Sequence, residues 1–237
     1  MAVANRQQQK AERPETTIEF CGAVFTPLCS GAMYWAEHQT LLVADLHLEK
    51  MSSFAKGGQF FPPYDTGATL KRLAADIEHS GAQRVIALGD SFHRDEGTTT
   101  LSLNDVDAVS AMTIKVDWIW IAGNHDPSEH ELGGSCCESV AMDGIILSHE
   151  PDPKVKSQIA GHLHPSARVA INGRSTRSAC FVYDKVRMIM PAYGVSTGSL
   201  NVLKDVFQPV IKRSEMAVAV LGKDKVYPVS PKHLVHR

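Results

Sequence analysis

The alternation of apolar and polar positions between residues 40 and 125 predicts buried strands separated by amphipathic helices. Short apolar runs such as Arg84–Leu88 and Trp118–Ala122 are rich in β-branched or aromatic residues, which is typical of strands buried on both faces. In Thr66–Ser80 the apolar residues recur with helical spacing, and a glycine follows. A second helix is predicted around residues 104–112. This part of the chain therefore predicts a βαβαβ unit with parallel strands.

The pattern is different at the two ends of the chain, where short strands follow one another without helices. Strands are predicted near residues 17–20, 23–25 and 31–35, and a hairpin turn at Asp143-Gly144. Beyond His164, turn signals separate three more strands, so the last third predicts antiparallel β-structure: residues 168–171, 179–183 and 186–190.

Five apolar runs end in side chains that can bind a metal ion or move a proton. In open α/β sheets, sites form beyond the carboxyl ends of the strands, so these ends are expected to meet in one site. Six of the eleven histidines lie there, which is not expected of scattered structural histidines. The runs end at Asp45-Leu46-His47, Gly89-Asp90-Ser91-Phe92-His93, Gly123-Asn124-His125-Asp126, His149 and Gly161-His162-Leu163-His164.

Composition places these elements in one soluble domain. A chain of 237 residues suits a single α/β domain, which we expect over residues 18–237 after a flexible polar tail of residues 1–17. The tail lacks the apolar core of a secretory signal, and no apolar segment approaches the ~20 residues of a membrane helix. Five cysteines without a C-x-x-C pair favour a reducing compartment, so a cytoplasmic location is expected. A net charge of −2 means that an anionic substrate must be held locally.

The donor types at the strand ends predict a dinuclear metal site. Oxygen and imidazole donors without a thiolate suit Mn²⁺, Fe or Zn²⁺. Seven ligands are too many for one ion and suit a pair ~3.5–4 Å apart. A carboxylate at the tip of a central strand, such as Asp90, can donate one oxygen to each ion. The predicted ligands are Asp45, His47, Asp90, Asn124, His149, His162 and His164.

The ordered set of strand-end motifs resembles the five motifs of the calcineurin-like metallophosphoesterase superfamily. The resemblance implies a four-layer α/β/β/α sandwich with mixed sheets and the site at the carboxyl ends of the strands. It also implies which ligands belong together. Asp45, His47, Asp90 and His164 would hold one ion, and Asp90, Asn124, His149 and His162 the other, with Asp90 shared.

A closer resemblance, to the bacterial ligase-associated DNA-damage-response metallophosphoesterases, extends over most of the chain. It is carried by residues 43–50, 62–66, 88–93, 118–127, 159–165 and 191–202. That family implies a Mn²⁺-dependent phosphodiesterase or DNA endonuclease, associated with a DNA ligase, an exonuclease and a helicase. Two positions depart from expectation. Tyr193 stands where the family usually has Phe, and His93 stands where many phosphatases of the superfamily have Asp. A histidine there resembles the nuclease subunit of the double-strand-break repair complex and favours a nucleic-acid diester.

The resemblance and the chemistry together give a mechanistic hypothesis. Two ions would lower the pKa of an attacking water and neutralise charge on the phosphate. His125 would protonate the leaving alkoxide, and His93 would stabilise the transition state or position the phosphate. Asp126 would either orient His125 or cap the turn that follows. Arg94 would bind a phosphate, with a solvent-exposed arginine as the alternative.

The leading prediction is cleavage of single-stranded or flapped DNA, and three other functions are alternatives. A small-molecule or cyclic-nucleotide diesterase and a phosphomonoesterase would use the same metals. A non-catalytic scaffold, as suggested for the retromer subunit of this fold, is disfavoured by the complete ligand set and by His125. Basic residues in or near loops fit either nucleic-acid contact or ordinary surface charge: Lys50, Lys56, Arg168, Arg174 and Arg177. Aromatic residues in one loop fit either packing or a stacking rim: Phe54, Phe60, Phe61 and Tyr64.

Overall fold

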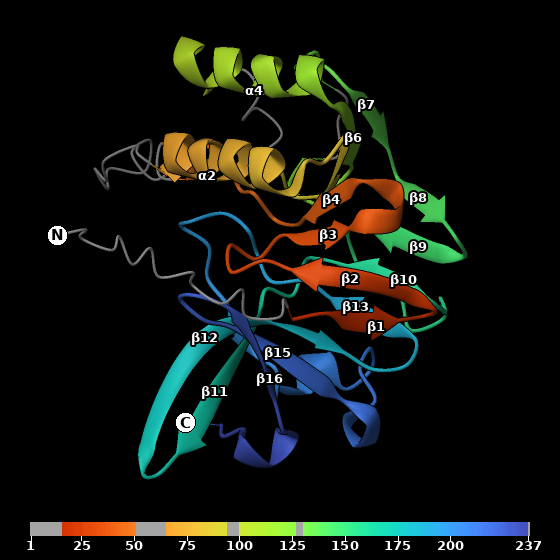
Figure 1. Ribbon diagram of the computed structural model, residues 1–237, viewed down its shortest axis with the longest axis vertical. Helices are drawn as coiled ribbons and strands as arrows, with labels where there is room; N and C mark the ends of the chain where they lie inside the picture. The colour runs from red at the N-terminus through yellow and green to blue at the C-terminus, as the bar shows by residue number, and fades with distance from the viewer. Residues whose placement is uncertain (1–15, 51–64, 94–99, 127–129, 237) are drawn as a thin grey trace, which may run out of the picture.

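Two β-sheets stack face to face, and two helices cover the outer face of the first sheet (Figure 1). The computed structural model describes residues 16–50, 65–93, 100–126 and 130–236. The helices are α2 (Asp65–Ser80) and α4 (Leu103–Lys115). At the start of α4 the Ser102 hydroxyl accepts a hydrogen bond from the backbone N–H of Asp105, which is a standard N-cap. Both helices lie where the apolar spacing predicts them.

The first sheet contains seven strands in sequence order. Strands β1 to β4 form an antiparallel meander, and β4, β5, β6 and β7 pair in parallel. The predicted βαβαβ unit is thus confirmed as β4-α2-β5-α4-β6. The strands are β1 (Ile18–Phe20), β2 (Ala23–Pro27), β3 (Met33–Trp35), β4 (Thr40–Val43), β5 (Arg84–Leu88), β6 (Asp117–Ile121) and β7 (Ser135–Cys137), with the 3₁₀ helix η1 (Ala36–His38) before β4.

The second sheet is mixed, which corrects the expectation of a purely antiparallel last third. Strands β9, β10 and β13 pair in parallel, and β14 pairs in parallel with β11, whereas the other pairs are antiparallel. Three strands of this sheet, β14 to β16, were not predicted. The strands are β8 (Ser139–Met142), β9 (Ile145–Ser148), β10 (Gln158–Ala160), β11 (Pro165–Ile171), β12 (Arg174–Tyr183), β13 (Arg187–Ile189), β14 (Leu200–Asn201), β15 (Ala217–Leu221) and β16 (Val226–Val229).

Three apolar clusters hold the layers together. The first lies between the sheets and joins Phe25 and Trp35 to Phe181, all fully buried. The second packs α2 and α4 on the first sheet. The third covers the outer face of the second sheet, where Phe207 and its neighbours pack on Cys180. In the described part of the chain, this outer layer consists of irregular chain with short 3₁₀ helices: η2 (Asp205–Phe207) and η3 (Arg213–Glu215), with η4 (Pro231–His233) near the C-terminus.

The chain segments that follow β4 and β5 stay paired beyond the regular strands. The backbone N–H of His47 donates to Asp90 O at 2.9 Å, and that of Leu48 donates to Ser91 O at 2.9 Å. The two segments therefore leave the sheet side by side, which fixes the spacing of the polar side chains they carry. Among the described helices, none has the length and apolar character needed to cross a membrane.

Candidate metal centre

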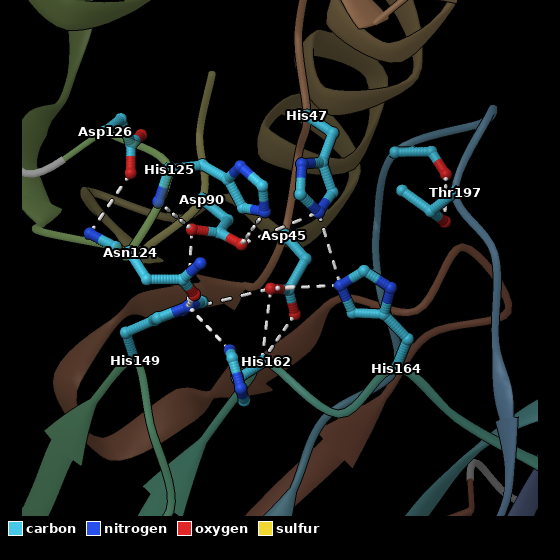
Figure 2. Close-up of polar contacts among 12 residues, drawn as sticks. Asp45, His47, Asp90, Asn124, His125, Asp126, His149, His162, His164 and Thr197 are labelled. Carbon is cyan, nitrogen blue, oxygen red and sulfur yellow. Dashed lines mark hydrogen bonds and ion pairs between the residues drawn. The ribbon is translucent and has the colours of Figure 1, made fainter. Parts of the chain in front are cut away.

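Seven polar residues converge where strands of both sheets end (Figure 2). Asp45 and His47 follow β4, Asp90 follows β5 and Asn124 follows β6. His149 follows β9 of the second sheet, and a short loop after β10 carries two more histidines. The structure thus brings together all seven predicted ligands: Asp45, His47, Asp90, Asn124, His149, His162 and His164.

In the first group the donor atoms of Asp45, His47 and His164 lie within 4.8 Å of one another. His164 Nε2 is 3.3 Å from Asp45 Oδ1 and 3.3 Å from His47 Nε2. His164 Nδ1 lies 3.2 Å from Gly198 O, so the neutral ring carries its proton on Nδ1 and presents a lone pair at Nε2. Lone pairs of nitrogen and carboxylate then face one another, an arrangement that needs a cation or a proton between them.

The second group has the same character. The donor atoms of Asp90, His149 and His162 lie within 4.8 Å of one another. His149 Nδ1 donates to Leu88 O at 3.0 Å, which leaves Nε2 as an acceptor. That Nε2 lies 2.9 Å from Asn124 Oδ1, 3.2 Å from His162 Nδ1 and 3.3 Å from Asp90 Oδ1. A divalent cation suits this convergence of acceptors.

Asp90 stands between the two groups. Its Oδ1 lies near His149, whereas its Oδ2 lies 3.7 Å from His47 Nε2. The backbone N–H of His125 donates to Oδ1 at 3.0 Å and fixes the carboxylate plane. Asp45 is held likewise, because the backbone N–H of His162 donates to both of its oxygens. The carboxylates are thus oriented by backbone groups before any ion binds.

The loops that carry these residues hold unusual backbone conformations. Five of the seven predicted ligands have a positive φ: Asp45 (54°), His47 (44°), Asp90 (47°), His162 (69°) and His164 (44°). A left-handed conformation costs a non-glycine residue roughly 1–2 kcal/mol. Such outliers cluster at functional sites, where the surrounding structure imposes them. Close packing of the loops against one another supplies that constraint here.

The charge states of the histidines fit a cation site. Burial lowers the pKa of His47 to about 2, and the neighbouring His164 and Lys50 add to the effect. Burial also lowers the pKa of His162. For His164, burial lowers the pKa, but the hydrogen bond and charge of Asp45 outweigh it and the net pKa is raised. His47 and His162 are therefore neutral donors, and His164 attracts a positive charge at its Nε2 side.

The predicted catalytic histidines lie beside the first group. The rings of His93 and His125 stack with centroids 5.6 Å apart, and His47 lies 5.5 Å from His125 in an edge-on contact. The His125 side chain is 44% exposed, and its Nε2 lies 3.9 Å from Asp90 Oδ2. His125 is thus open to solvent on one side and borders the carboxylate shared by both groups on the other.

Asp126 connects two loops through its carboxylate. The backbone N–H of Phe92 donates to Oδ2 at 3.0 Å, and that of Gly123 donates to Oδ1 at 3.1 Å. Burial raises the pKa of Asp126 to about 6, against the opposing effect of these backbone hydrogen bonds. Its contacts within the described part of the chain therefore join the loops after β5 and β6. Arg94, the predicted phosphate ligand, lies outside the described residues, as do Lys56, Phe54, Phe60, Phe61 and Tyr64.

Two histidines outside the motifs, His38 and His130, are partly buried, which their neighbours in the sequence do not indicate. His130 packs between Phe92 and Trp120, with ring centroids 5.2 and 5.0 Å away, and burial lowers its pKa. His38 contacts Trp35 edge-on and lies 2.7 Å from Asp143 Oδ2, in an exposed group that also contains Glu37. The contact with Gly198 O that orients His164 was also not anticipated, because no local pattern in the sequence marks it.

Comparison with known proteins agrees with this geometry. The calcineurin-like phosphoesterase family matches residues 38–142, which include four of the seven metal-binding candidates. Residues 38–142 thus match a calcineurin-like phosphoesterase domain. The crystal structure of the Pseudomonas putida nuclease MPE aligns with a TM-score of 0.72 and 27% sequence identity, over 91% of this chain and 100% of that chain.

Two other solved structures align less closely with this chain. A protein of unknown function from Aquifex aeolicus is 17% identical over 53% of this chain and 78% of its own, with a TM-score of 0.39. The Yfce phosphoesterase from E. coli is 14% identical over 83% of this chain and 96% of its own, with a TM-score of 0.35. Among curated proteins, none matches the sequence significantly.

Proposed function

We propose that this chain is a dinuclear metallophosphoesterase, a phosphodiesterase that cleaves DNA as an endonuclease in DNA repair. The observation that carries the proposal is the pair of acceptor groups with one oxygen of Asp90 directed to each. The similarity to a nuclease over 91% of the chain favours a nucleic-acid diester over other phosphoesters. Association with a DNA ligase, an exonuclease or a helicase stays a prediction.

The donor set fits two divalent metal ions. Asp45, His47, Asp90 and His164 would hold one, and Asp90, Asn124, His149 and His162 the other. Bound there, the ions would supply an activated water and would neutralise charge on the phosphate. Mixed oxygen and imidazole donors without thiolate favour Mn²⁺, with Fe and Zn²⁺ as alternatives.

The histidines at the rim carry the proton chemistry in this proposal. His125 is partly exposed and its Nε2 lies 3.9 Å from the shared ligand Asp90, so His125 would donate a proton to the leaving oxygen of a phosphodiester bound at the ions. His93 stacks on His125 and would position its ring and the phosphate. Asp126 would act through the backbone, since its two oxygens keep the loops of His93 and His125 together.

The test is hydrolysis of an aryl phosphodiester, its monoester, and single- and double-stranded DNA in the presence of Mn²⁺. We expect activity on the diester and on DNA. Asp90→Ala should abolish both because it removes a ligand of both ions. His125→Ala should reduce turnover of DNA by ~10²–10⁴-fold with metal binding retained, as loss of a general acid does.

Each alternative gives a different result. Hydrolysis of the monoester without cleavage of DNA would show that the protein is a phosphatase and not a nuclease. Diester turnover confined to small substrates or cyclic nucleotides would make the chain a small-molecule diesterase. A folded protein that binds metal and hydrolyses none of the four substrates with Mn²⁺, Fe²⁺ or Zn²⁺ would support the scaffold.

A further inference from the structure

A cationic cleft lies next to the metal centre. It has a volume of about 620 Å³ and is formed by the outer half of β12, the turn after β2 and the segment of residues 192–197. Three of its lining side chains are charged, and all three are basic: Arg72, Arg177 and Lys223. A concave surface lined by charges of one sign attracts ligands of the opposite sign.

One chain segment, residues 193–199, separates the cleft from the candidate metal ligands. On one side, the backbone N–H of Gly194 donates to Asp45 O at 3.1 Å, and His164 Nδ1 lies 3.2 Å from Gly198 O. On the other side, Gly194 lines the cleft, and the Arg177 guanidinium donates to both oxygens of Ser199. The cleft therefore starts within a few residues of the ligands Asp45 and His164.

Arg177 is fixed in position at this junction. Its Nε donates to Ser166 Oγ at 3.1 Å, and its Nη2 donates to Ser199 Oγ at 3.0 Å. An arginine whose side chain is held by neutral hydroxyls keeps its full charge for a ligand. The bidentate geometry of guanidinium suits phosphate oxygens in particular.

Arg72 lines the cleft and stacks on a buried tyrosine ring. Its guanidinium carbon lies 4.3 Å above the ring of the buried Tyr193. Its Nε and Nη2 are buried, so Arg72 acts on a ligand in the cleft through its positive charge and not through hydrogen bonds from these two atoms. The nearby carboxylate of Asp76 is engaged by the Tyr193 hydroxyl, which donates to it at 2.8 Å.

The adjoining β11–β12 hairpin extends the positive surface away from the site (Figure 1). Residues 165–183 contain Arg168, Arg174 and Arg177 and no acidic residue. Arg168 and Arg177 occupy directly opposed positions on the two strands. Like charges at such positions destabilise a hairpin, and an anion between them would remove the repulsion.

We propose that this cleft binds the phosphates of a nucleic-acid strand that flanks the bond held at the metal centre. The assignment rests on the proposed function, because the strand must enter a site that cleaves diesters. Phosphates spaced along a strand match cations spaced along a surface, from Arg72 and Arg177 beside the metal ligands to Lys223 at the exposed side. A small diester reaches only the metals and makes no use of the cleft.

The experiment compares two substrates and direct binding in the full chain. Arg177→Gln combined with Lys223→Gln, and Lys223→Glu alone, are tested beside Lys115→Gln. Lys115 is an exposed residue that precedes the amino end of β6, opposite the end that carries the site. Measurements are the kcat and KM for a short single-stranded oligonucleotide and for an aryl diester with Mn²⁺, and fluorescence-anisotropy binding of the oligonucleotide without added metal.

We expect the double variant to raise the KM and the Kd for the oligonucleotide by at least ~10-fold at moderate salt, with the slope of log Kd against log salt reduced by ~1.4. Lys223→Glu should weaken binding in the same direction without disturbing the Ser199 loop. Turnover of the aryl diester should change by less than ~2-fold, because this substrate does not reach the cleft and surface substitutions elsewhere have small effects. Lys115→Gln should behave as the unmodified protein on both substrates.

Three results would overturn the cleft assignment. The first is unchanged oligonucleotide binding in both variants. The second is an equal loss on both substrates, which would mean that Arg177 acts on His164 through Ser199 and Gly198. The third is competition by inorganic phosphate as effective as that of the oligonucleotide, the behaviour of a simple anion site. Failure of the proposed function would give a different result. The unmodified protein would bind the oligonucleotide without cutting it, and the variants would lose this binding.

Discussion

At the scale of single residues, the glycines before the candidate ligands leave room for the ligands of other loops. A Cβ on Gly161 would lie 2.7 Å from Asp45 Oδ2, and one on Gly123 would lie 2.3 Å from Asp90 Oδ1. Neither glycine has a positive φ, so close approach of the loops, and not backbone freedom, requires them. In the Gly-Asn-His-Asp and Gly-His-x-His motifs, the glycine thus allows close packing of the loops, and the residues after it supply candidate metal ligands.

Gly161→Ala should weaken metal binding more than it weakens the fold. The added methyl pushes the Asp45 carboxylate away from His164, and loss of such orientation typically costs 10–100-fold in metal affinity. Calorimetric titration with Mn²⁺ measures the affinity. Gly198→Ala is the matched control, because a Cβ there meets nothing within 4 Å. Equal Mn²⁺ affinities for the two variants would show that the close approach does not matter.

Asp126 allows a test between a positioning role and a catalytic one. In Asp126→Asn, one amide oxygen can replace one carboxylate oxygen, but the NH₂ group then faces a backbone N–H of Phe92 or Gly123. We expect a loss of about 1–3 kcal/mol of stability, the cost of an unsatisfied buried group.

Kinetics distinguish the two roles of Asp126. If it acts by holding the loops, the variant should lose kcat with the shape of its pH–rate profile unchanged. A shift in the basic limb of that profile would instead show that Asp126 orients His125, which is one of the two roles that the sequence suggests.

At the scale of elements, the sequence predicted best where local pattern and tertiary role coincide. Strands β4, β5 and β6 are largely buried apolar runs that end in candidate ligands, so both their existence and their functional ends can be read from neighbouring residues. Strand β15 contains only alanine, valine and leucine, and it exists because it pairs with β12 over four positions. Such pairing depends on context far away in the chain.

The same limit explains why the burial of His130 cannot be read from the sequence. His130 is covered by Phe92 and Trp120, which come from the ends of two different strands. No spacing within the sequence around residue 130 indicates these neighbours. The motifs allowed the seven ligands to be predicted as one group. The cleft beside them could not be predicted, because β12, α2 and the segment after β13 form it and no single motif contains all three.

Two glycines at the ends of α2 should respond in opposite ways to alanine. Gly67 is exposed in the first turn, and the nearest atom to an added Cβ would be 3.7 Å away. Gly67→Ala should therefore stabilise the protein by about 0.5–1 kcal/mol through helix propensity. Gly81 follows the helix with a φ of +66°, so Gly81→Ala should destabilise by about 1–2 kcal/mol despite open space. Urea denaturation of both variants measures the pair, and a shift of the same sign in both would contradict this account.

At the scale of the whole molecule, the candidate metal centre lies across the junction of the two sheets. Asp45, His47, Asp90 and Asn124 extend from the first sheet, and the other three candidates extend from the second. An ion in either group would therefore bond to both sheets. Without ions, the buried carboxylates and imidazole lone pairs face one another across that junction, which opposes the packing of the apolar core.

Metal binding should consequently stabilise the entire fold. At a free Mn²⁺ concentration of about 100 times its Kd, linkage predicts about 2.7 kcal/mol per site. For a chain of this size, each occupied site should raise the Tm by about 5–10 °C. Differential scanning calorimetry with and without a chelator measures the change. Asp90→Asn should remove most of the rise, because it weakens both groups. It should also leave the metal-free Tm equal to or above that of the unmodified protein, since a buried negative charge facing other acceptors is lost. A Tm insensitive to Mn²⁺ in the unmodified protein would contradict ligation across the two sheets.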